Sequence, residues 1–285
     1  MRIIDGISEI ADGYEAMLCD AWGVIHNGRR VFEGAAEAMA AFRRERGPVL
    51  VLTNAPRPSE IIPAQLDRLG LPRECWDAIV TSGDATMFEF ERRAPGPAFR
   101  LGPEKDDPMF EGRGLSFAPI EDAAFIACTG LFHDETEEPD AYRELLQKGA
   151  DRNIPMVCAN PDIIVDFGGK RMWCAGALAA IYEEMGGAVI HVGKPHSPIY
   201  GLAFEKLKRV AGRDIPRGKI LAVGDGLATD IKGANDHDLD VVFVASGIHG
   251  DEAQGADGCL DAEKLAGVLS GEGRTAVAGI EELRW

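Results

Sequence analysis

Short apolar runs alternate along the chain with segments whose apolar residues recur at helical spacing. Runs of consecutive apolar residues are typical of strands buried on both faces, as in a parallel sheet. The runs expected to form one core sheet are 16–19, 49–52, 79–81, 189–192, 220–223 and 241–244. The helices expected between them are 34–46, 58–69, 82–93 and 197–210. This alternation predicts an α/β fold with a Rossmann-like, doubly wound parallel sheet.

The alternation is interrupted from about residue 94, where prolines and glycines become frequent. Further strands and helices are expected at 123–128, 139–148, 155–158 and 176–185, with a Gly-Gly bend at 168–169. We therefore expect a discontinuous core of residues 1–81 and 187–285 and an inserted α/β domain at 82–186. Residues 1–13 are expected to form a short helix, and the last fifteen residues an edge strand or a loose end.

Polar side chains stand at or just beyond the ends of the expected core strands. They are Asp20, Thr53, Asn54, Lys194 and Asp225. If the strands are parallel, these residues meet at one edge of the sheet, where open α/β sheets bind ligands. An acid in this place can be a nucleophile, a metal ligand or both. A helix cap or an ordinary turn aspartate is the alternative for Asp20 taken alone.

The segment from Gly224 to Asp230 follows an expected strand and carries two carboxylates five residues apart. Together with Asp20, these carboxylates could bind Mg²⁺ through oxygen ligands. Lys194 would then balance the acids and hold a phosphoryl oxygen, with Thr53 and Asn54 as further phosphate donors. The alternatives are a helix start capped by Thr229 and Asp230, a solvated lysine and a turn-forming Asn54.

As a set, these motifs resemble those of the haloacid dehalogenase superfamily. The matching residues in chain order are Asp20 with Gly23 and Val24, Thr53 with Asn54, Lys194, and Asp225 with Asp230. The insertion between the second and third motifs is similar to the α/β cap of subfamily IIA, which includes the nitrophenyl-phosphatase-like and pyridoxal-phosphate phosphatases.

The resemblance implies a role for each matching residue. Asp20 would attack phosphorus and also bind Mg²⁺, together with the carbonyl of Trp22 and the carboxylate of Asp225. Asp230 would support this metal site from behind.

The resemblance also implies residues that hold the substrate. Thr53 and Lys194 would bind the transferring phosphoryl group. In the insertion, Asn160, Pro161 and Asp162 form a segment similar to the loop that such caps place over the substrate.

One position departs from the family pattern. Trp22 stands where most phosphatases of this family carry a second aspartate, which protonates the leaving oxygen and later activates water. The loss of a general acid and base typically costs ~10²–10⁴ in rate. Either the leaving group departs without a proton, or another residue such as His26, His196 or Asp162 replaces the acid, or the protein is a slow enzyme or a phosphate-ligand binder.

The composition of the chain indicates which classes of partner and which cellular compartment to expect. The formal net charge of −17, without a basic cluster, argues against a nucleic-acid binder. No secretory signal or apolar segment of membrane-spanning length is visible, so we expect no membrane partner. The six cysteines form no Cys-x-x-Cys pair, which favours buried thiols in the cytoplasm. A homodimer is compatible with the sequence, which leaves the oligomeric state open.

These observations lead to one main functional hypothesis. We expect a Mg²⁺-dependent phosphatase that hydrolyses a small phosphorylated metabolite through an aspartyl-phosphate on Asp20. One alternative is a catalytically weak or inactive protein that binds a phosphorylated metabolite. A metal-independent dehalogenase is the other, because true dehalogenases carry an aromatic residue at the position of Trp22. The clustering of Asp225 and Asp230 speaks against it.

Overall fold

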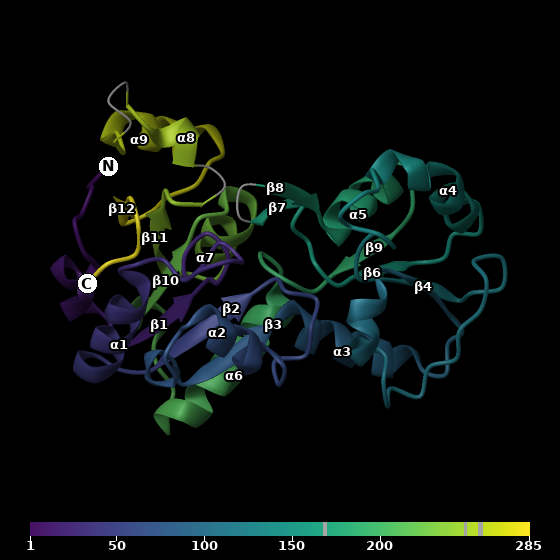
Figure 1. Ribbon diagram of the computed structural model, residues 1–285, viewed down its shortest axis with the longest axis horizontal. Coiled ribbons are helices and arrows are strands. Elements are labelled where there is room, and N and C mark those ends of the chain that lie inside the picture. Colours follow the sequence, from purple (N-terminus) through teal and green to yellow (C-terminus); the bar gives the residue numbers. More distant parts are fainter. Residues whose placement is uncertain (168–169, 248–249, 256–258) are drawn as a thin grey trace.

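Two parallel sheets, of six and four strands, form the framework of the protein (Figure 1). The computed structural model describes residues 1–167, 170–247, 250–255 and 259–285. In Figure 1 the six-stranded sheet lies in the left half of the molecule and the four-stranded sheet in the right half. The predicted α/β fold with a Rossmann-like sheet and an inserted cap is confirmed.

The six-stranded sheet has the order β12-β11-β10-β1-β2-β3, and all its pairs are parallel. Its strands are β1 (Ala16–Cys19), β2 (Val49–Thr53), β3 (Ala78–Thr81), β10 (Ile220–Gly224), β11 (Asp240–Val244) and β12 (Ala278–Ile280). From β1 the chain first builds outward through β2 and β3, and later adds β10 to β12 on the other side of β1. The order therefore reverses between β1 and β10, which is the position at which open α/β sheets bind ligands. β12 is the edge strand expected among the last residues.

Helices cover both faces of this sheet because successive strand residues point to opposite faces. On one face, Met17 and Val51 pack with α1 (Ala35–Glu45) and α2 (Ile62–Leu69). On the other face, Leu18 and Leu50 pack with side chains of helices that follow in the second half of the chain. These helices are α6 (Ser197–Ala211), α7 (Lys232–Asp236) and α9 (Ala262–Gly271). The burial of every residue of β1, β2 and β10 explains their unbroken apolar runs.

The four-stranded sheet belongs to the inserted domain and has the order β4-β5-β6-β9. Its strands are β4 (Ala98–Leu101), β5 (Phe125–Cys128), β6 (Met156–Cys158) and β9 (Val189–His191). One face packs against α4 (Arg143–Asp151) and α5 (Ala175–Glu184), and the other against Met87 and Phe90 of α3 (Ser82–Arg93). The helix α3 begins directly after β3, so it links the two sheets.

The strand predicted at 189–192 forms, but its predicted place in the core sheet is wrong. β9 pairs in parallel with β6, with Val157 opposite Ile190, so it is the last strand of the inserted sheet. An apolar run indicates a buried strand but not its partner, because tertiary packing selects the partner. The four-stranded sheet therefore extends past residue 187, where the sequence pattern placed the return to the core.

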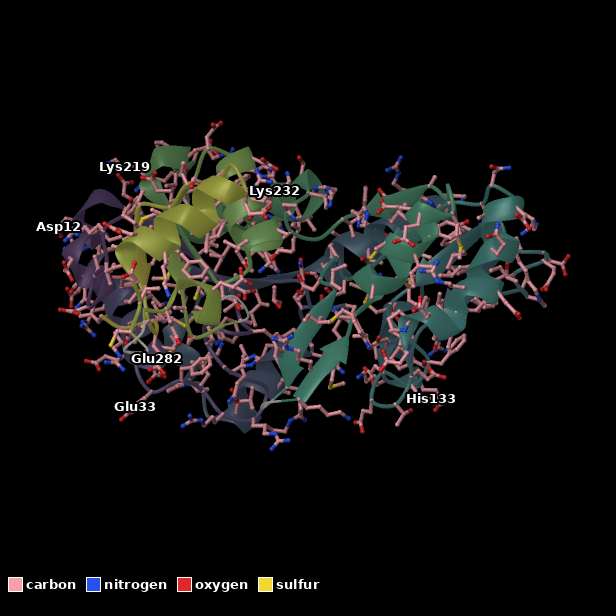
Figure 2. All side chains as sticks on the ribbon, turned by 90° about the horizontal axis from the view of Figure 1, so that it is seen from above. Asp12, Glu33, His133, Lys219, Lys232 and Glu282 are labelled. Carbon is pink, nitrogen blue, oxygen red and sulfur yellow. The ribbon has the colours of Figure 1, made fainter. Side chains whose placement is uncertain are left out.

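An antiparallel hairpin, not predicted from the sequence, projects from the inserted domain. It consists of β7 (Ile164–Phe167) and β8 (Lys170–Trp173), and in Figure 1 it lies between the two halves of the molecule. The Gly-Gly bend predicted at 168–169 lies outside the described residues. Figure 2 shows the two halves side by side, with Asp12 and Lys219 at the core end and His133 on the inserted domain.

Short helical turns complete the described chain. The helix predicted over residues 1–13 is instead two single 3₁₀ turns, because Gly6 before the first turn is extended and Ile10 between the turns is not helical. The 3₁₀ turns are Ile7–Glu9, Ala11–Gly13, Arg73–Cys75, Glu104–Met109, Pro139–Tyr142 and Arg217–Lys219, with a π-helical turn at Leu227–Ile231 and a short α8 at Gly250–Ala253. Within the described ranges, no helix combines the length and the apolar character needed to cross a membrane.

Candidate active site

Asp20 follows β1 at the point where the strand order reverses. Its backbone N–H donates to the carbonyl oxygen of Val223 at 2.9 Å, which extends the pairing of β1 with β10. The residue is only 6% exposed. The structure therefore places Asp20 at the expected edge of the sheet, at the reversal of strand order where open α/β sheets bind ligands.

Lys194 lies between two of the predicted acids. Its Nζ donates to Asp20 Oδ1 at 2.5 Å and to Asp230 Oδ1 at 2.6 Å, and all three residues are buried. Burial alone would lower the pKa of this lysine, but the two carboxylates outweigh burial and raise it. Lys194 therefore remains a fixed positive charge, suited to balancing the acids and attracting a phosphoryl oxygen.

Three acids of the site are close enough to share a cation. Asp20, Asp225 and Asp230 each offer an oxygen, and these oxygens lie within 4.8 Å of one another. Burial, followed by the nearby charge of Asp230, raises the pKa of Asp20, while Lys194 opposes this shift. Three carboxylates and one ammonium carry a summed charge of −2 when ionised, which a divalent cation would neutralise. These buried oxygen donors fit Mg²⁺, which would also favour the ionised form of Asp20.

Glycines make room for Asp225. A Cβ atom at Gly23 would lie 2.3 Å from Asp225 Oδ2, and one at Gly247 only 1.7 Å from the same atom. Gly23 also has a φ of +79°, a conformation that favours glycine. The hydroxyl of Ser246 donates to the carbonyl oxygen of Gly23 at 2.8 Å and ties the two loops together. Sequence analysis missed Ser246 and Gly247, although their position after the apolar run of β11 was a usable signal.

Asp230 is oriented by the turn that carries it. Its Oδ2 accepts the backbone N–H of Gly226 at 3.2 Å, while its Oδ1 accepts Lys194 Nζ. A Cβ atom at Gly224 would lie 2.2 Å from the Cβ of Asp230, so the turn after β10 also depends on glycine. Both oxygens of Asp230 have protein partners. This arrangement fits a residue that orients the groups around a metal ion and does not itself bind the ion.

Asn54 connects the core to the Lys194 turn and to the inserted domain. Its Oδ1 accepts the backbone N–H of Lys194 at 2.7 Å, and its Nδ2 donates to Lys194 O at 3.2 Å and to Asp162 Oδ1 at 2.8 Å. Both hydrogens of the amide are therefore used within the protein. In this structure the amide thus holds the Lys194 turn, and the predicted role of Asn54 as a phosphate donor stays a prediction. The neighbouring Thr53 is buried and its Oγ1 accepts the N–H of Ala55 at 3.3 Å, which leaves its hydroxyl hydrogen for another acceptor.

The cap segment Asn160-Pro161-Asp162 lies directly against the Lys194 turn. A Cβ atom at Gly193 would lie 2.7 Å from Pro161 Cδ. The Oδ1 of Asn160 accepts the backbone N–H of Asp162 at 3.0 Å, which fixes the bend of the segment. Burial raises the pKa of Asp162 to about 6, with Lys194 and the hydrogen bond from Asn54 opposing the shift. The structure thus brings a cap carboxyl with a pKa near neutrality to the site.

Trp22 packs under the hairpin of the inserted domain. Its ring centroid lies 5.8 Å from that of Phe167 on β7 and 5.0 Å from that of His26. A Cβ atom at Gly28 would lie 2.5 Å from Trp22 Cη2, so glycine permits this packing. The indole therefore forms an apolar wall two residues after Asp20. The predicted role of the Trp22 carbonyl as a metal ligand stays a prediction.

Neither histidine considered as a replacement acid is suited to that role. His26 is 1% exposed, its Nδ1 accepts the N–H of Gly28 at 3.1 Å, and burial lowers its pKa to about 4. Its ring is therefore neutral at physiological pH. His196 is exposed and stacks on His191 of β9, with ring centroids 4.9 Å apart. Its pKa is lowered by partial burial and by His191 and Lys232, and its acidic neighbours are Glu183 and Asp236 and not the acids of the site.

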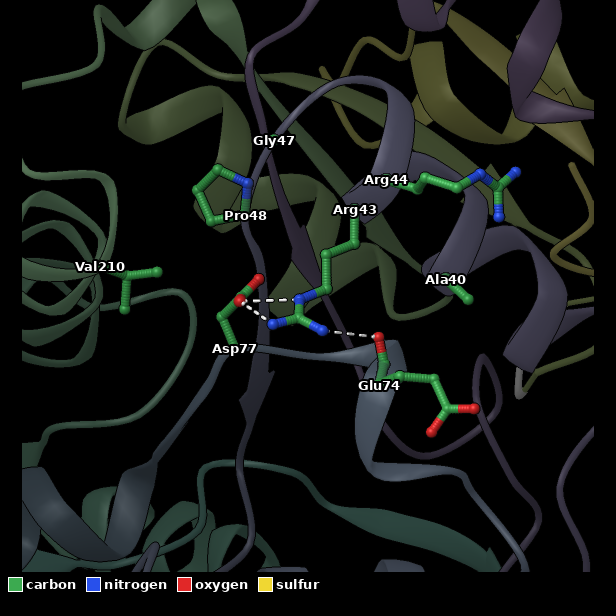
Figure 3. A pocket seen from close by; sticks show the side chains of 8 residues that line it. All are labelled: Ala40, Arg43, Arg44, Gly47, Pro48, Glu74, Asp77 and Val210. Carbon is green, nitrogen blue, oxygen red and sulfur yellow. Dashed lines mark hydrogen bonds and ion pairs between the residues drawn. The ribbon is translucent and has the colours of Figure 1, made fainter.

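A surface pocket of about 550 Å³ lies away from this site (Figure 3). Its lining includes Pro48, which precedes β2, and Asp77, which precedes β3, so it is at the opposite edge of the parallel sheet. Arg43 spans the pocket wall through hydrogen bonds to Asp77 Oδ1 at 2.7 Å and to Glu74 O at 3.0 Å (Figure 3). The polar residues expected to meet at the carboxyl edge are thus separate from this pocket.

Comparisons with known proteins identify the family of the chain. Residues 17–116 match the model of haloacid dehalogenase-like hydrolases, and residues 191–265 match a second, HAD-hydrolase-like model. These two matches contain the motif residues from Asp20 to Asn54 and from Lys194 to Asp230.

Relatives extend the likeness over the whole chain. A haloacid dehalogenase-like hydrolase from Brucella suis is 37% identical, with a TM-score of 0.88 over 99% of this chain and 100% of that one. An acid sugar phosphatase of Staphylococcus saprophyticus is 25% identical over 82% of this chain and 88% of that protein. A 4-nitrophenylphosphatase from Thermotoga maritima shares the fold, with 21% identity and a TM-score of 0.68 over 95% of each chain. Sequence motifs, sheet order and full-length similarity together show that the chain belongs to the haloacid dehalogenase-like hydrolase family.

Proposed function

We propose that the protein is a Mg²⁺-dependent phosphatase that hydrolyses a small phosphorylated metabolite through an aspartyl-phosphate on Asp20. The observation that carries the proposal is the buried contact of Lys194 with both Asp20 and Asp230, beside Asp225. Phosphoryl transfer depends mainly on positioning and electrostatic stabilisation, which this group of side chains supplies. The acid sugar phosphatase among the relatives supports the choice of a small phosphorylated substrate.

Each residue would have a defined task in this reaction. Asp20 forms a bond to phosphorus as the bond to the leaving oxygen breaks, and water later releases phosphate from Asp20. Lys194 and the hydroxyl of Thr53 bind oxygens of the transferring group, and Asn54 holds Lys194 in place. Asp20, Trp22 and Asp225 would hold Mg²⁺, with Asp230 behind them, and the bound ion would neutralise phosphoryl charge.

The test is hydrolysis of nitrophenyl phosphate and of sugar phosphates, with Mg²⁺ and with a chelator in its place. We expect Asp20→Asn to lower kcat by more than ~10³, because removal of a covalent nucleophile leaves only binding and electrostatic effects. Asp12→Asn, which alters an exposed acid at the far end of the core, is the control and should retain wild-type activity. Hydrolysis that persists both in Asp20→Asn and in the chelator would contradict the proposal.

A second candidate function follows from Trp22. Because this indole cannot transfer a proton, the site could bind a phosphorylated metabolite without turnover. That function predicts saturable binding by calorimetry together with no phosphate release above background in the hydrolysis assay.

We propose the cytoplasm as the compartment of the protein. The buried, unpaired thiols of Cys19, Cys128 and Cys158 support this proposal, because disulfides are rare in the cytoplasm.

A further inference from the structure

The proposed reaction needs a group that gives a proton to the leaving oxygen and later takes one from water. Trp22, at the usual position of that group, is packed against Phe167 and His26. His26 is buried with its Nδ1 already accepting a hydrogen bond, and His196 is exposed and stacked on His191. The structure therefore leaves the proton transfer to some other side chain at the site.

Asp162 is held at the site by contacts with core residues. Asn54 Nδ2 donates to Asp162 Oδ1 at 2.8 Å, and the same amide group holds the backbone of Lys194. The Nζ of Lys194 in turn contacts Asp20. This chain of hydrogen bonds joins the cap carboxyl to the residue expected to attack phosphorus.

The in-line geometry of phosphoryl transfer also places the leaving oxygen on the side of the inserted domain. In phosphoryl transfer the attacking and leaving oxygens lie roughly in line on opposite sides of phosphorus. Asp20 attacks from the end of β1 in the core, so the leaving oxygen must point away from the core floor. Asp162 approaches from the inserted domain, which is the side that an in-line reaction requires.

We propose that Asp162 is the general acid and base of this reaction and replaces the aspartate that Trp22 displaces. The proposal rests on the phosphatase function proposed above. In the first step, the Asp162 carboxylic acid gives its proton to the leaving oxygen as the P–O bond breaks and Asp20 bonds to phosphorus. In the second step, the Asp162 carboxylate takes a proton from water as the water oxygen bonds to phosphorus. The bond from Asp20 to phosphorus breaks, phosphate leaves, and Asp162 is again protonated.

The charges around Asp162 are compatible with both protonation states. Its pKa is raised to about 6, first by burial and also by Asp230, while Lys194 and Asn54 favour the carboxylate. A group with a pKa near the working pH can serve as acid in one step and base in the next. Asp162 is partly exposed, so the proton can exchange with solvent between turnovers.

The experiment compares wild type with Asp162→Asn on alkyl phosphates, such as sugar phosphates, and on nitrophenyl phosphate. The specificity constant kcat/KM reports transfer to Asp20, which needs a proton only for a poor leaving group. We expect kcat/KM for alkyl phosphates to fall by ~10²–10⁴, and that for nitrophenyl phosphate by less than about tenfold. Because the second step lacks its base, rapid mixing should show a burst of one nitrophenolate per enzyme, followed by slow turnover.

A structural role for Asp162 gives a different result. If the residue only holds the cap in place, Asp162→Asn lowers kcat/KM equally for both substrate classes and produces no burst, which overturns the proposal. The pH profile of the wild-type protein gives a second test that does not depend on whether the variant folds. Above a pH of about 6, kcat/KM for alkyl phosphates should fall more steeply than kcat/KM for nitrophenyl phosphate. Equal profiles would also overturn the proposal. If wild type releases phosphate from neither class, the phosphatase function itself has failed.

A rescue variant completes the test. Trp22→Asp in the Asp162→Asn background returns a carboxyl to the usual position, and alkyl-phosphate kcat/KM should recover at least tenfold relative to Asp162→Asn. If the double variant folds but its kcat/KM for alkyl phosphates does not recover, proton transfer is not the function that Asp162→Asn removes, and the proposal is contradicted.

Discussion

Asn54 shows how one side chain can take a role that its sequence position does not reveal. The sequence offered a phosphate donor or a turn former, whereas the structure uses both ends of the amide to hold Lys194 and to contact Asp162. These partners lie more than a hundred residues away in the chain. A pattern of strands and turns places Asn54 at the sheet edge, but it cannot show which hydrogen bonds the amide makes there.

The acids of the site were more predictable. Asp20 and Asp225 follow apolar runs that form adjacent parallel strands, so their meeting at one edge follows from the strand pattern. The buried state of His26 was not predictable in this way. Its neighbours Val24 and Ile25 are fully buried, and they draw the loop inward although a histidine in a loop is more often exposed.

His26 makes stability depend on pH. Its pKa is lowered to about 4 in the folded protein, against 6.5 for an exposed histidine, so folding favours the neutral ring. This contribution is present above pH 6.5 and is lost as pH falls toward 4, by up to about 3 kcal/mol. We therefore expect His26→Gln to weaken the fall in Tm between pH 6.5 and 4, measured by thermal unfolding. His133→Gln, at an exposed site, should keep the wild-type slope, and an unchanged slope in His26→Gln would contradict the prediction.

At the scale of elements, the main difference from the sequence prediction is the partner of β9. Its apolar run resembles those of the core strands, and the helix α6 follows it as helices follow the core strands. The strand nevertheless pairs with β6, where Val189 and Ile190 pack against the two hydrophobic clusters of the inserted domain. The hairpin of β7 and β8 escaped prediction for another reason: its residues are mostly half-exposed or exposed, so they lack the apolar run of a buried strand.

The turns after β1 and β11 show how an element depends on glycine. Gly23→Ala would push on the Asp225 carboxylate, since its Cβ would lie 2.3 Å from Oδ2. We expect the Mg²⁺ concentration for half-maximal activity to rise about 10- to 100-fold, the typical effect of disturbing residues behind a metal site. Activity measured against Mg²⁺ concentration checks this result.

Gly70 provides the matched control for this substitution. It has a φ of +89°, close to the +79° of Gly23, but a Cβ atom there would meet nothing within 4 Å. Gly70→Ala should therefore lower stability by about 1 kcal/mol through backbone strain alone and leave the Mg²⁺ dependence as in wild type. Equal Mg²⁺ curves for both variants would show that contact with Asp225 is unimportant.

At the scale of the whole molecule, the site joins two sheets that the sequence could only place in separate domains. Asp20, Asp225 and Asp230 come from the core, whereas Lys194 and Asp162 arrive from segments that follow strands of the inserted sheet. The sequence predicted the insertion and its α/β character from the break near residue 94. The strand and helix pattern could not predict the contact between the halves, because side-chain packing across them leaves no periodic signal. The expectation that residues 160–162 lie over the site came from the family resemblance alone.

Metal binding should stabilise the assembled site against unfolding. A ligand at 100 times its Kd adds about 2.7 kcal/mol, which corresponds to a rise in Tm of roughly 5 °C for a chain of this size. We expect this rise on addition of Mg²⁺ and its loss on addition of a chelator, as measured by thermal unfolding. Asp225→Asn should abolish the rise, and a shift that persists in this variant would place the ion elsewhere.

The position of Lys194 after β9 has a practical consequence for exchanging inserted domains between relatives. The lysine is attached to the last strand of the inserted sheet, yet its charge neutralises acids of the core. If an inserted domain were exchanged with a junction at residue 187, β6 would come from one protein and β9 from the other. The lysine turn of one protein would then follow a sheet of the other. Chimeras joined beyond Pro195 would instead transfer the strand, the turn and the ammonium group as one unit.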